Sequence, residues 1–337
     1  MTASTNLFRL YANCFPVRGA RRSLVCDLQK GHAQFIPNDL YEILTEMRDL
    51  TLSQIKAQYD NEQDQTLEMY FDLLVDQEYG FWCDEPERFP DLDLSWDRPE
   101  AVTNAIVDVD KNSSHDFASI FDQLDELGCQ ALQVRAYDEL PLTELERVLE
   151  AAAPTRFRHM DLVLKFHPEL TGDRLLELAC RYQVISRIVV HSSPAPAKPD
   201  AGRMPVVIRF HKEALTAESC GEVAPAYFSI TTEHFTEGLL FNTCLNRKIS
   251  VSVDGEIKGC PAMGHSCGNI SQVRLEEAMR NPALVQIGSI TKDQIAVCRD
   301  CEFRYICTDC RAFTASPGDL YSKPAKCSYD PYTATWT

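Results

Sequence analysis

The chain has 337 residues, 45% of them apolar and 25% charged, so it is long enough for two or three globular domains and is not a disordered protein. Its 50 acidic residues outnumber 33 basic ones, and the net charge of -17 repels nucleic-acid backbones and anionic membrane surfaces. The sequence shows neither a signal-peptide pattern nor a run of roughly 18 apolar residues. We therefore expect a cytoplasmic protein with no nucleic-acid partner and no membrane partner.

Residues 1–90 predict an α/β domain of short strands followed by three helices. The strand-like segments are 7–11, 23–28 and 33–36, and the last two flank a predicted hairpin turn. Asp39 and Glu42 form a capping-box pattern at the start of the first helix, and Ser53 is a cap for the second. The third helix carries an apolar stripe at helical spacing: Leu67, Tyr70, Phe71, Leu74 and Val75.

This order of elements is typical of a winged helix-turn-helix, a fold that usually binds DNA. Residues 39–97 hold 17 acidic and only three basic residues, which argues against DNA here. The domain resembles the leader-peptide recognition domain of pathways that modify ribosomally made peptides. In that fold an extended peptide adds to a sheet edge beside the third helix. The resemblance implies a peptide-binding edge formed by Ala33, Gln34, Phe35 and Ile36, with Tyr70 and Leu74 on the groove wall.

After a proline-rich linker at 91–100, residues 101–240 alternate strands with amphipathic helices and predict a partial βα barrel. The clearest strands are 105–109, 131–135, 162–166 and 188–191, with weaker candidates at 206–210 and 227–231. Asp108, Asp110, His115 and Asp116 surround the first strand-to-helix loop. Two interpretations stay open for them, a divalent metal site or the turn and helix cap that such residues usually form.

Cysteines divide the sequence more sharply than any other residue type. Six are scattered singly over the first 243 residues, and we expect them to be packing residues: Cys14, Cys26, Cys83, Cys129, Cys180 and Cys220. The other eight crowd into residues 241–337, which we take as a separate cysteine-rich domain. In a reducing compartment, eight cysteines so close together in the sequence predict metal binding rather than disulfides.

The cysteine-rich domain has a defined spacing. Ten residues separate Cys244 from Gly255 and four more lead to Cys260, while Cys298, Cys301, Cys307, Cys310 and Cys327 follow after a gap. Two residues between cysteines direct both sulfurs to one side, and a glycine hairpin turns the chain back toward the site. Thr308 and Asp309, between two predicted ligands, are expected to donate hydrogen bonds near them. Eight thiolates meet the ligand demand of two four-iron clusters or of two zinc ions.

The pattern resembles the SPASM domain, which binds two auxiliary four-iron, four-sulfur clusters in radical S-adenosylmethionine enzymes that modify peptides. More narrowly, segments along nearly the whole chain resemble the SPASM-domain peptide maturase of "grasp-with-spasm" systems: NCFPVRGARRS (13–23), FIPNDLYEI (35–43), CEFRYICTDCRAF (301–313) and CSYDPY (327–332). That family is encoded beside an ATP-grasp ligase and a precursor peptide, in pathways related to graspetides.

The resemblance implies which cysteines hold which cluster. One would be held by Cys298, Cys301, Cys307 and Cys327, and the other by Cys244, Cys260 and Cys310 with a fourth ligand that the pattern leaves open. Cys267 is our candidate for that place, with His265 or an open iron as alternatives. Zinc remains the alternative for the whole domain, since thiolate zinc sites stabilise small loop-rich folds.

The chain lacks the C-x-x-x-C-x-x-C triplet that holds the cluster for radical chemistry. We therefore expect a protein of ribosomal-peptide maturation that binds the precursor leader and works with an ATP-grasp ligase. Whether it is an enzyme stays open; an activity would be redox or metal-assisted modification of a peptide, without the usual radical cleavage. The alternatives are an iron-sulfur electron-transfer protein and a zinc-stapled binding scaffold.

Overall fold

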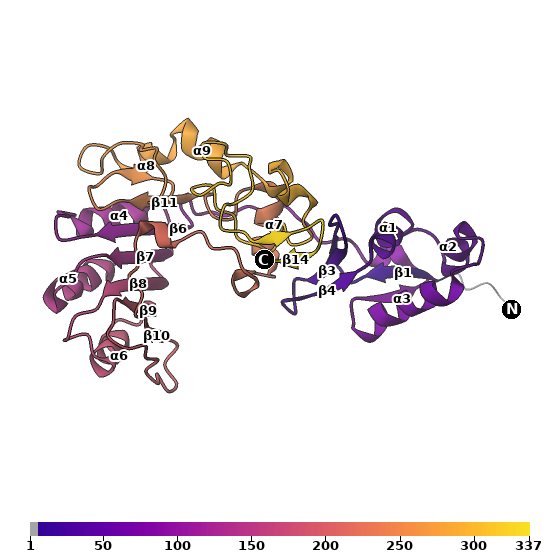
Figure 1. The fold of residues 1–337 in the computed structure, drawn as a ribbon, viewed down its shortest axis with the longest axis horizontal. Helices are drawn as coiled ribbons and strands as arrows, with labels where there is room; N and C mark the ends of the chain where they lie inside the picture. The colour runs from indigo at the N-terminus through magenta and orange to yellow at the C-terminus, as the bar shows by residue number, and fades with distance from the viewer. Residues whose placement is uncertain (1–5) are drawn as a thin grey trace. The chain divides into compact units, whose positions relative to one another are not determined.

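The computed structural model describes residues 6–337, which form two compact units. The first unit combines the described part of Met1–Trp96 with Glu222–Thr243 and Ile290–Thr337. The second unit combines Asp97–Gly221 with Cys244–Ser289. Each unit is therefore assembled from separate stretches of chain, and the cysteine-rich region at 241–337 is divided between them (Figure 1).

Two small sheets open the first unit. β1 (Leu7–Leu10) pairs antiparallel with β5 (Gly80–Cys83), while β2 (Cys14–Val17), β3 (Ser23–Asp27) and β4 (His32–Ile36) form an antiparallel sheet in that order. The predicted hairpin between β3 and β4 is confirmed, and Gly31 supplies its positive φ of 73°. The sequence reading missed β2 because Pro16 weakens its strand signal; proline is tolerated there because β2 is an edge strand.

Three helices follow, as predicted: α1 (Asn38–Glu46), α2 (Leu52–Gln58) and α3 (Asp64–Asp76). The predicted caps are wrong, because Thr51 and Gln54 form the capping box of α2 and α1 begins after Pro37 without a side-chain cap. On α3, Leu67, Phe71 and Leu74 are buried in a core shared with Phe8 and Ile36. The helical stripe thus packs against the strands, although Val75 is exposed.

The rest of the first unit consists of short elements. They comprise α7 (Thr232–Leu240), β13 (Tyr329–Asp330), β14 (Thr335–Trp336) and 3-10 helices η1 (Pro86–Arg88), η3 (Pro225–Tyr227), η4 (Lys292–Gln294) and η5 (Cys298–Asp300). The predicted strand at 227–231 is wrong, because Thr231 instead caps α7. A second core joins Leu24 and Cys26 of β3 to Phe303, Ile306 and Tyr329.

A seven-stranded sheet organises the second unit. Its order is β10 (Val207–Phe210), β9 (Ile185–His191), β8 (His159–Lys165), β7 (Ala131–Ala136), β6 (Asn104–Val109), β11 (Lys248–Val251) and β12 (Ile257–Lys258). All neighbours are parallel except β11 and β12, which form a hairpin. This sheet confirms the alternating βα prediction for the middle of the chain.

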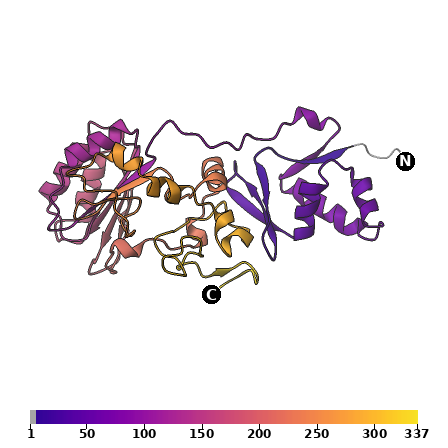
Figure 2. The ribbon, with the colours of Figure 1, turned by 90° about the horizontal axis from the view of Figure 1, so that it is seen from above.

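Helices follow the strands in the predicted rhythm. α4 (Phe117–Glu126), α5 (Leu142–Ala152) and α6 (Gly172–Arg181) follow β6, β7 and β8 in turn, and Figures 1 and 2 show all three on one side of the sheet. The remaining helices are η2 (Ala217–Ser219), α8 (Leu275–Met279) and α9 (Pro282–Gly288). Within residues 6–337 no helix is long and apolar enough to cross a bilayer.

Candidate metal centre

The first group of predicted ligands lies in the first unit, around Cys307. Cys298 opens η5, and the Cys301 amide donates to the Cys298 carbonyl at 3.0 Å, closing the turn that the two-residue spacing predicts. Burial raises the pKa of Cys301, and the neighbouring thiols of Cys307 and Cys298 add to the shift. Burial also raises the pKa of Cys307, with a further contribution from Cys327. The other three predicted ligands of this cluster, Cys298, Cys301 and Cys327, therefore lie within electrostatic reach of Cys307.

A buried lysine lies against this group of thiols. Lys292 Nζ is 3.2 Å from Cys307 Sγ and 3.1 Å from the Thr308 carbonyl oxygen, and only 3% of the residue is exposed. Burial raises the pKa of Cys298 to about 12, and the Lys292 charge opposes that shift. The sequence reading missed Lys292, because nothing in its spacing connects it with the cysteines.

The charges behind Lys292 are not balanced by protein groups alone. Asp309 Oδ1 lies 3.6 Å from Lys292 Nζ and 2.7 Å from Arg311 Nη2, and all three side chains are buried. Two cations thus share one carboxylate beside four thiols. Thiolates bound to metal would supply the missing negative charge, so the residues present fit a thiolate-metal centre.

The predicted donor roles next to Cys307 need correction. Asp309 is an acceptor: the Asn242 side-chain amide donates to its Oδ2 at 2.7 Å. Thr308 Oγ1 is buried and has no hydrogen-bond partner among the described residues. The donor to the sulfur of Cys307, a predicted ligand, is Lys292 rather than either residue named from the sequence.

The second group of thiols lies in the second unit, around Cys260. The β11–β12 hairpin turns at Gly255, whose φ is 84°, and thus carries the chain from Cys244 before β11 to Cys260 after β12. A hydrogen bond with Cys220 is the largest cause of the raised pKa of Cys260, followed by burial, and Cys244 adds to it. Cys220 was expected to be a packing residue, yet it belongs to this group.

The other residues predicted for the second cluster lie elsewhere or in the other unit. The Cys267 amide donates to the Ile257 carbonyl at 2.8 Å, its side chain packs against the sheet core, and burial alone raises its pKa. His265 is exposed on the same loop. Cys310 belongs to the first unit, so its assignment with Cys244 and Cys260 stays a prediction.

Only some of the scattered cysteines are packing residues as predicted. Cys14, Cys26 and Cys129 are buried, whereas Cys180 is exposed.

Among residues 6–337, no set of three or more His, Cys, Asp or Glu side chains is close enough to hold a single metal ion.

The acidic loop after β6 is structural. Both carboxylate oxygens of Asp108 accept from the Arg135 guanidinium, at 2.7 and 2.8 Å, and the Tyr137 hydroxyl donates at 3.1 Å. Asp110 Oδ1 accepts from the Asn112 amide at 2.8 Å, which shapes the turn. Asp116 caps α4, and the His115 ring lies 2.9 Å from the Asp108 carbonyl oxygen. The metal interpretation of this loop is wrong, because every carboxylate in it already has a structural role.

The predicted peptide edge exists, but its groove has different walls. β4 pairs only with β3 among the described residues, so its outer edge is unpaired there. A groove of about 370 Å³ lies beside it in the first unit, lined by Ala33 and Phe35 of β4 and by Phe228, Ile230 and Phe303. Leu74 and Ile36 are buried in the helical core and cannot form a wall. Tyr70 lies within electrostatic range of Asp39 and Tyr59, between the helices, where burial raises its pKa.

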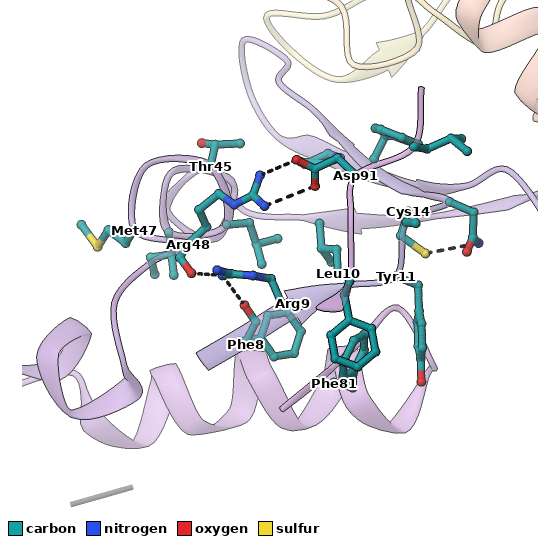
Figure 3. A pocket seen from close by; sticks show the side chains of 18 of the residues that line it. Phe8, Arg9, Leu10, Tyr11, Cys14, Thr45, Met47, Arg48, Phe81 and Asp91 are labelled. Carbon is teal, nitrogen blue, oxygen red and sulfur yellow. Dashed lines mark hydrogen bonds and ion pairs between the residues drawn. The ribbon is translucent and has the colours of Figure 1, made fainter. Parts of the chain in front are cut away.

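A larger apolar cavity of about 710 Å³ lies elsewhere in the first unit (Figure 3). Phe8, Leu10 and Phe81 line it from β1 and β5, and the segment predicted as a linker forms another wall. There Asp91 pairs at 3.2 Å with Arg48, which follows the end of α1. The beginning of the predicted linker is therefore part of a packed wall.

Comparisons with known proteins agree with the cysteine pattern. Residues 243–302 match the SPASM family, an iron-sulfur cluster-binding domain. The chain is also similar to a crystal structure of SuiB from Streptococcus suis bound to S-adenosylmethionine, at 12% identity and a TM-score of 0.39, covering 95% of this chain and 97% of SuiB. A second SuiB crystal structure gives 10% identity and a TM-score of 0.32, covering 92% and 95%. No curated protein sequence matches. The protein thus carries a SPASM domain.

Proposed function

We propose that this protein takes part in the maturation of a ribosomally made peptide, binding the precursor leader and carrying two four-iron, four-sulfur clusters. The observation that carries the cluster part is the gathering of Cys298, Cys301 and Cys327 around Cys307, beside a SPASM match. An iron-sulfur cluster, when bound, supplies one-electron redox chemistry.

The chain's own residues prepare such a centre in two ways. Burial keeps the metal-free thiols protonated, so loading a metal would release protons from them. Lys292 and Arg311 bring more positive charge than Asp309 offsets, which favours the thiolate form that a metal requires.

Peptide binding is proposed at the β4 edge and its groove. An extended peptide can pair its backbone with an unpaired strand, while pockets beside the strand select its side chains. Phe35 is 41% exposed in this groove, and the Arg22 guanidinium lies 3.5 Å over its ring while pairing with Glu302 at 2.9 Å. Apolar side chains of a leader would therefore fit between Phe35, Phe228 and Phe303. The family resemblance supplies the remaining partner, an ATP-grasp ligase.

A binding experiment tests the peptide part. The resemblance implies a short precursor peptide encoded beside this chain. A fluorescein-labelled synthetic copy of that peptide is the probe, titrated against the full-length protein and followed by fluorescence anisotropy. Phe35→Glu should weaken binding at least about tenfold, since a charge replaces an aromatic wall of the groove. Phe89→Glu is the matched control, because Phe89 is a similarly exposed aromatic that lines the larger cavity instead.

The outcome separates the candidate functions. Unchanged affinity in Phe35→Glu would place peptide binding elsewhere. No affinity for the peptide in the unaltered protein would favour an electron-transfer protein if iron is bound, or a zinc-stapled scaffold if zinc is bound.

A further inference from the structure

Cys220 is a scattered cysteine that the fold places beside thiols of the second unit. It follows η2, whose capping box between Thr216 and Ser219 fixes the turn before it. Its Sγ donates to the Ala217 carbonyl oxygen at 3.2 Å, and the residue is half-buried. Its backbone and side chain are therefore held in a defined turn.

The partner of this thiol is Cys260, a cysteine of the SPASM pattern. The two side chains form a hydrogen bond, and Cys244 lies within electrostatic reach of Cys260. The hairpin accounts for the second proximity, because Val251 pairs with Ile257 and Ser250 with Lys258, so the chain before β11 and the chain after β12 lie at the same end. Cys220 and Cys244, from two other segments of the second unit, thus each lie near Cys260.

Cationic groups also lie near these thiols. Lys248 lies within electrostatic range of Cys260, and Cys220 lies within electrostatic range of the buried Arg135. Cys267 has a different environment: its side chain packs on the sheet core, where burial is the only resolved influence on it.

We propose that Cys220 is a ligand of the second iron-sulfur site, together with Cys244 and Cys260, and that Cys267 is not. This inference rests on the proposed function, since it assigns a ligand of one of the two clusters. It takes a residue from outside the SPASM match at 243–302 and gives it the place that the spacing left open and for which Cys267 was the candidate. On loading, the thiol proton of Cys220 leaves and its sulfur bonds to iron.

The test compares Cys220→Ala with Cys267→Ala in the full chain, both reconstituted anaerobically with ferrous iron and sulfide. Two loaded clusters correspond to about eight irons and eight sulfides per chain. We expect Cys267→Ala to keep about eight irons. Cys220→Ala should lose at least about one iron, which leaves a three-iron cluster visible by electron paramagnetic resonance. If the whole cluster is lost, the variant should lose about four irons. Cys180→Ala controls for removal of an exposed cysteine.

A second measurement does not depend on the variant folding. Iodoacetamide labelling of Cys220 in the unaltered protein, followed by peptide mass spectrometry, should be at least about tenfold slower in loaded than in metal-free protein, because an iron-bound sulfur is not a free nucleophile. Equal labelling rates, or a Cys220–Cys260 disulfide in the loaded protein, would overturn the inference. So would full iron content in Cys220→Ala. Failure of the proposed function looks different, since the unaltered protein would then bind no iron at all.

Discussion

The thiols around Cys307 and those around Cys260 differ in how far apart their residues lie in the sequence. Three thiols of the first group lie within one short segment: Cys298, Cys301 and Cys307. Their spacing alone therefore predicts a metal site. The second group joins a loop after η2 to the two ends of a hairpin. Sequence spacing predicts ligands that lie close together in the sequence. Candidate ligands that only folding brings together can be identified only from the structure.

The surroundings of the two groups differ as well. Cys307 has a buried ammonium at 3.2 Å, whereas Lys248 acts on Cys260 only through its charge. A direct donor to a ligand sulfur stabilises the more negative state of a bound cluster more than a distant charge does. We therefore expect the first site to be the more easily reduced of the two.

Removing the central thiol of the first group should have the largest effect. Cys307→Ala should lose between about one and about four of about eight irons per chain, because it removes one of the four cysteines that hold a four-iron cluster. Iron and sulfide assays on the anaerobically reconstituted variant measure this. Cys26→Ala is the matched control: Cys26 is buried in the same core, and its loss should cost about 1 kcal/mol of stability with no loss of iron. Equal iron in both variants would refute the assignment of Cys307.

The buried ion pair of the second unit predicts a large effect on stability alone. Arg135→Met leaves Asp108 buried and unpaired, which should lower the free energy of unfolding by about 3–5 kcal/mol. Urea denaturation measures the change. Arg147→Met is the control, because Arg147 and Glu144 form an exposed pair whose loss should change stability by less than about 0.5 kcal/mol. A loss of bound metal in folded Asp108→Asn would revive the metal interpretation of this loop.

The pH dependence should distinguish loaded from metal-free protein. The pKa of Cys298 is raised from 9.0 to about 12 by burial, so its thiol stays protonated in the folded chain after it has ionised in the unfolded chain. The contribution of this protonated thiol to the free energy of unfolding is complete below pH 9. Above pH 9 it falls by about 1.4 kcal/mol per pH unit, until the pH reaches the pKa of the folded state. The urea midpoint of metal-free protein should therefore drop between pH 8 and 10, by more than that of loaded protein. Parallel curves for the two forms would contradict the account.

The smallest expected effect concerns Lys292. Lys292→Met removes the ammonium beside Cys307 and should shift the reduction potential of the first site to a more negative value, with iron content unchanged. Potentiometric titration followed by visible absorbance measures it. Lys212→Met, an exposed lysine of the second unit, should leave both potentials unchanged. An unshifted potential in Lys292→Met would show that this donor does not tune the centre.

Much of the fold followed from local pattern. The strands β6 to β9 and the helices between them are periodic apolar segments, and such segments form the same element in most contexts. β2 was missed because Pro16 interrupts a strand signal, and 227–231 was misread because Thr231 begins a helix instead. The division of residues 241–337 between two units depends on distant packing, which no local window contains.

The site shows the same limit. Lys292 lies 15 residues before Cys307 and Cys220 lies 40 residues before Cys260, and neither belongs to a recognisable spacing. The groove walls Phe228 and Phe303 are likewise supplied by chain segments distant from β4. A sequence pattern predicts the structure of a single loop, whereas these contacts form only when distant segments of the folded unit pack together.

The most direct test of the central claim is the content of iron, acid-labile sulfide and zinc per chain in anaerobically purified protein, with visible spectra before and after dithionite. The account predicts about eight irons and eight sulfides, with an absorbance that dithionite bleaches. About two zinc ions and no sulfide, even after anaerobic reconstitution, would contradict it and leave a zinc-stapled scaffold.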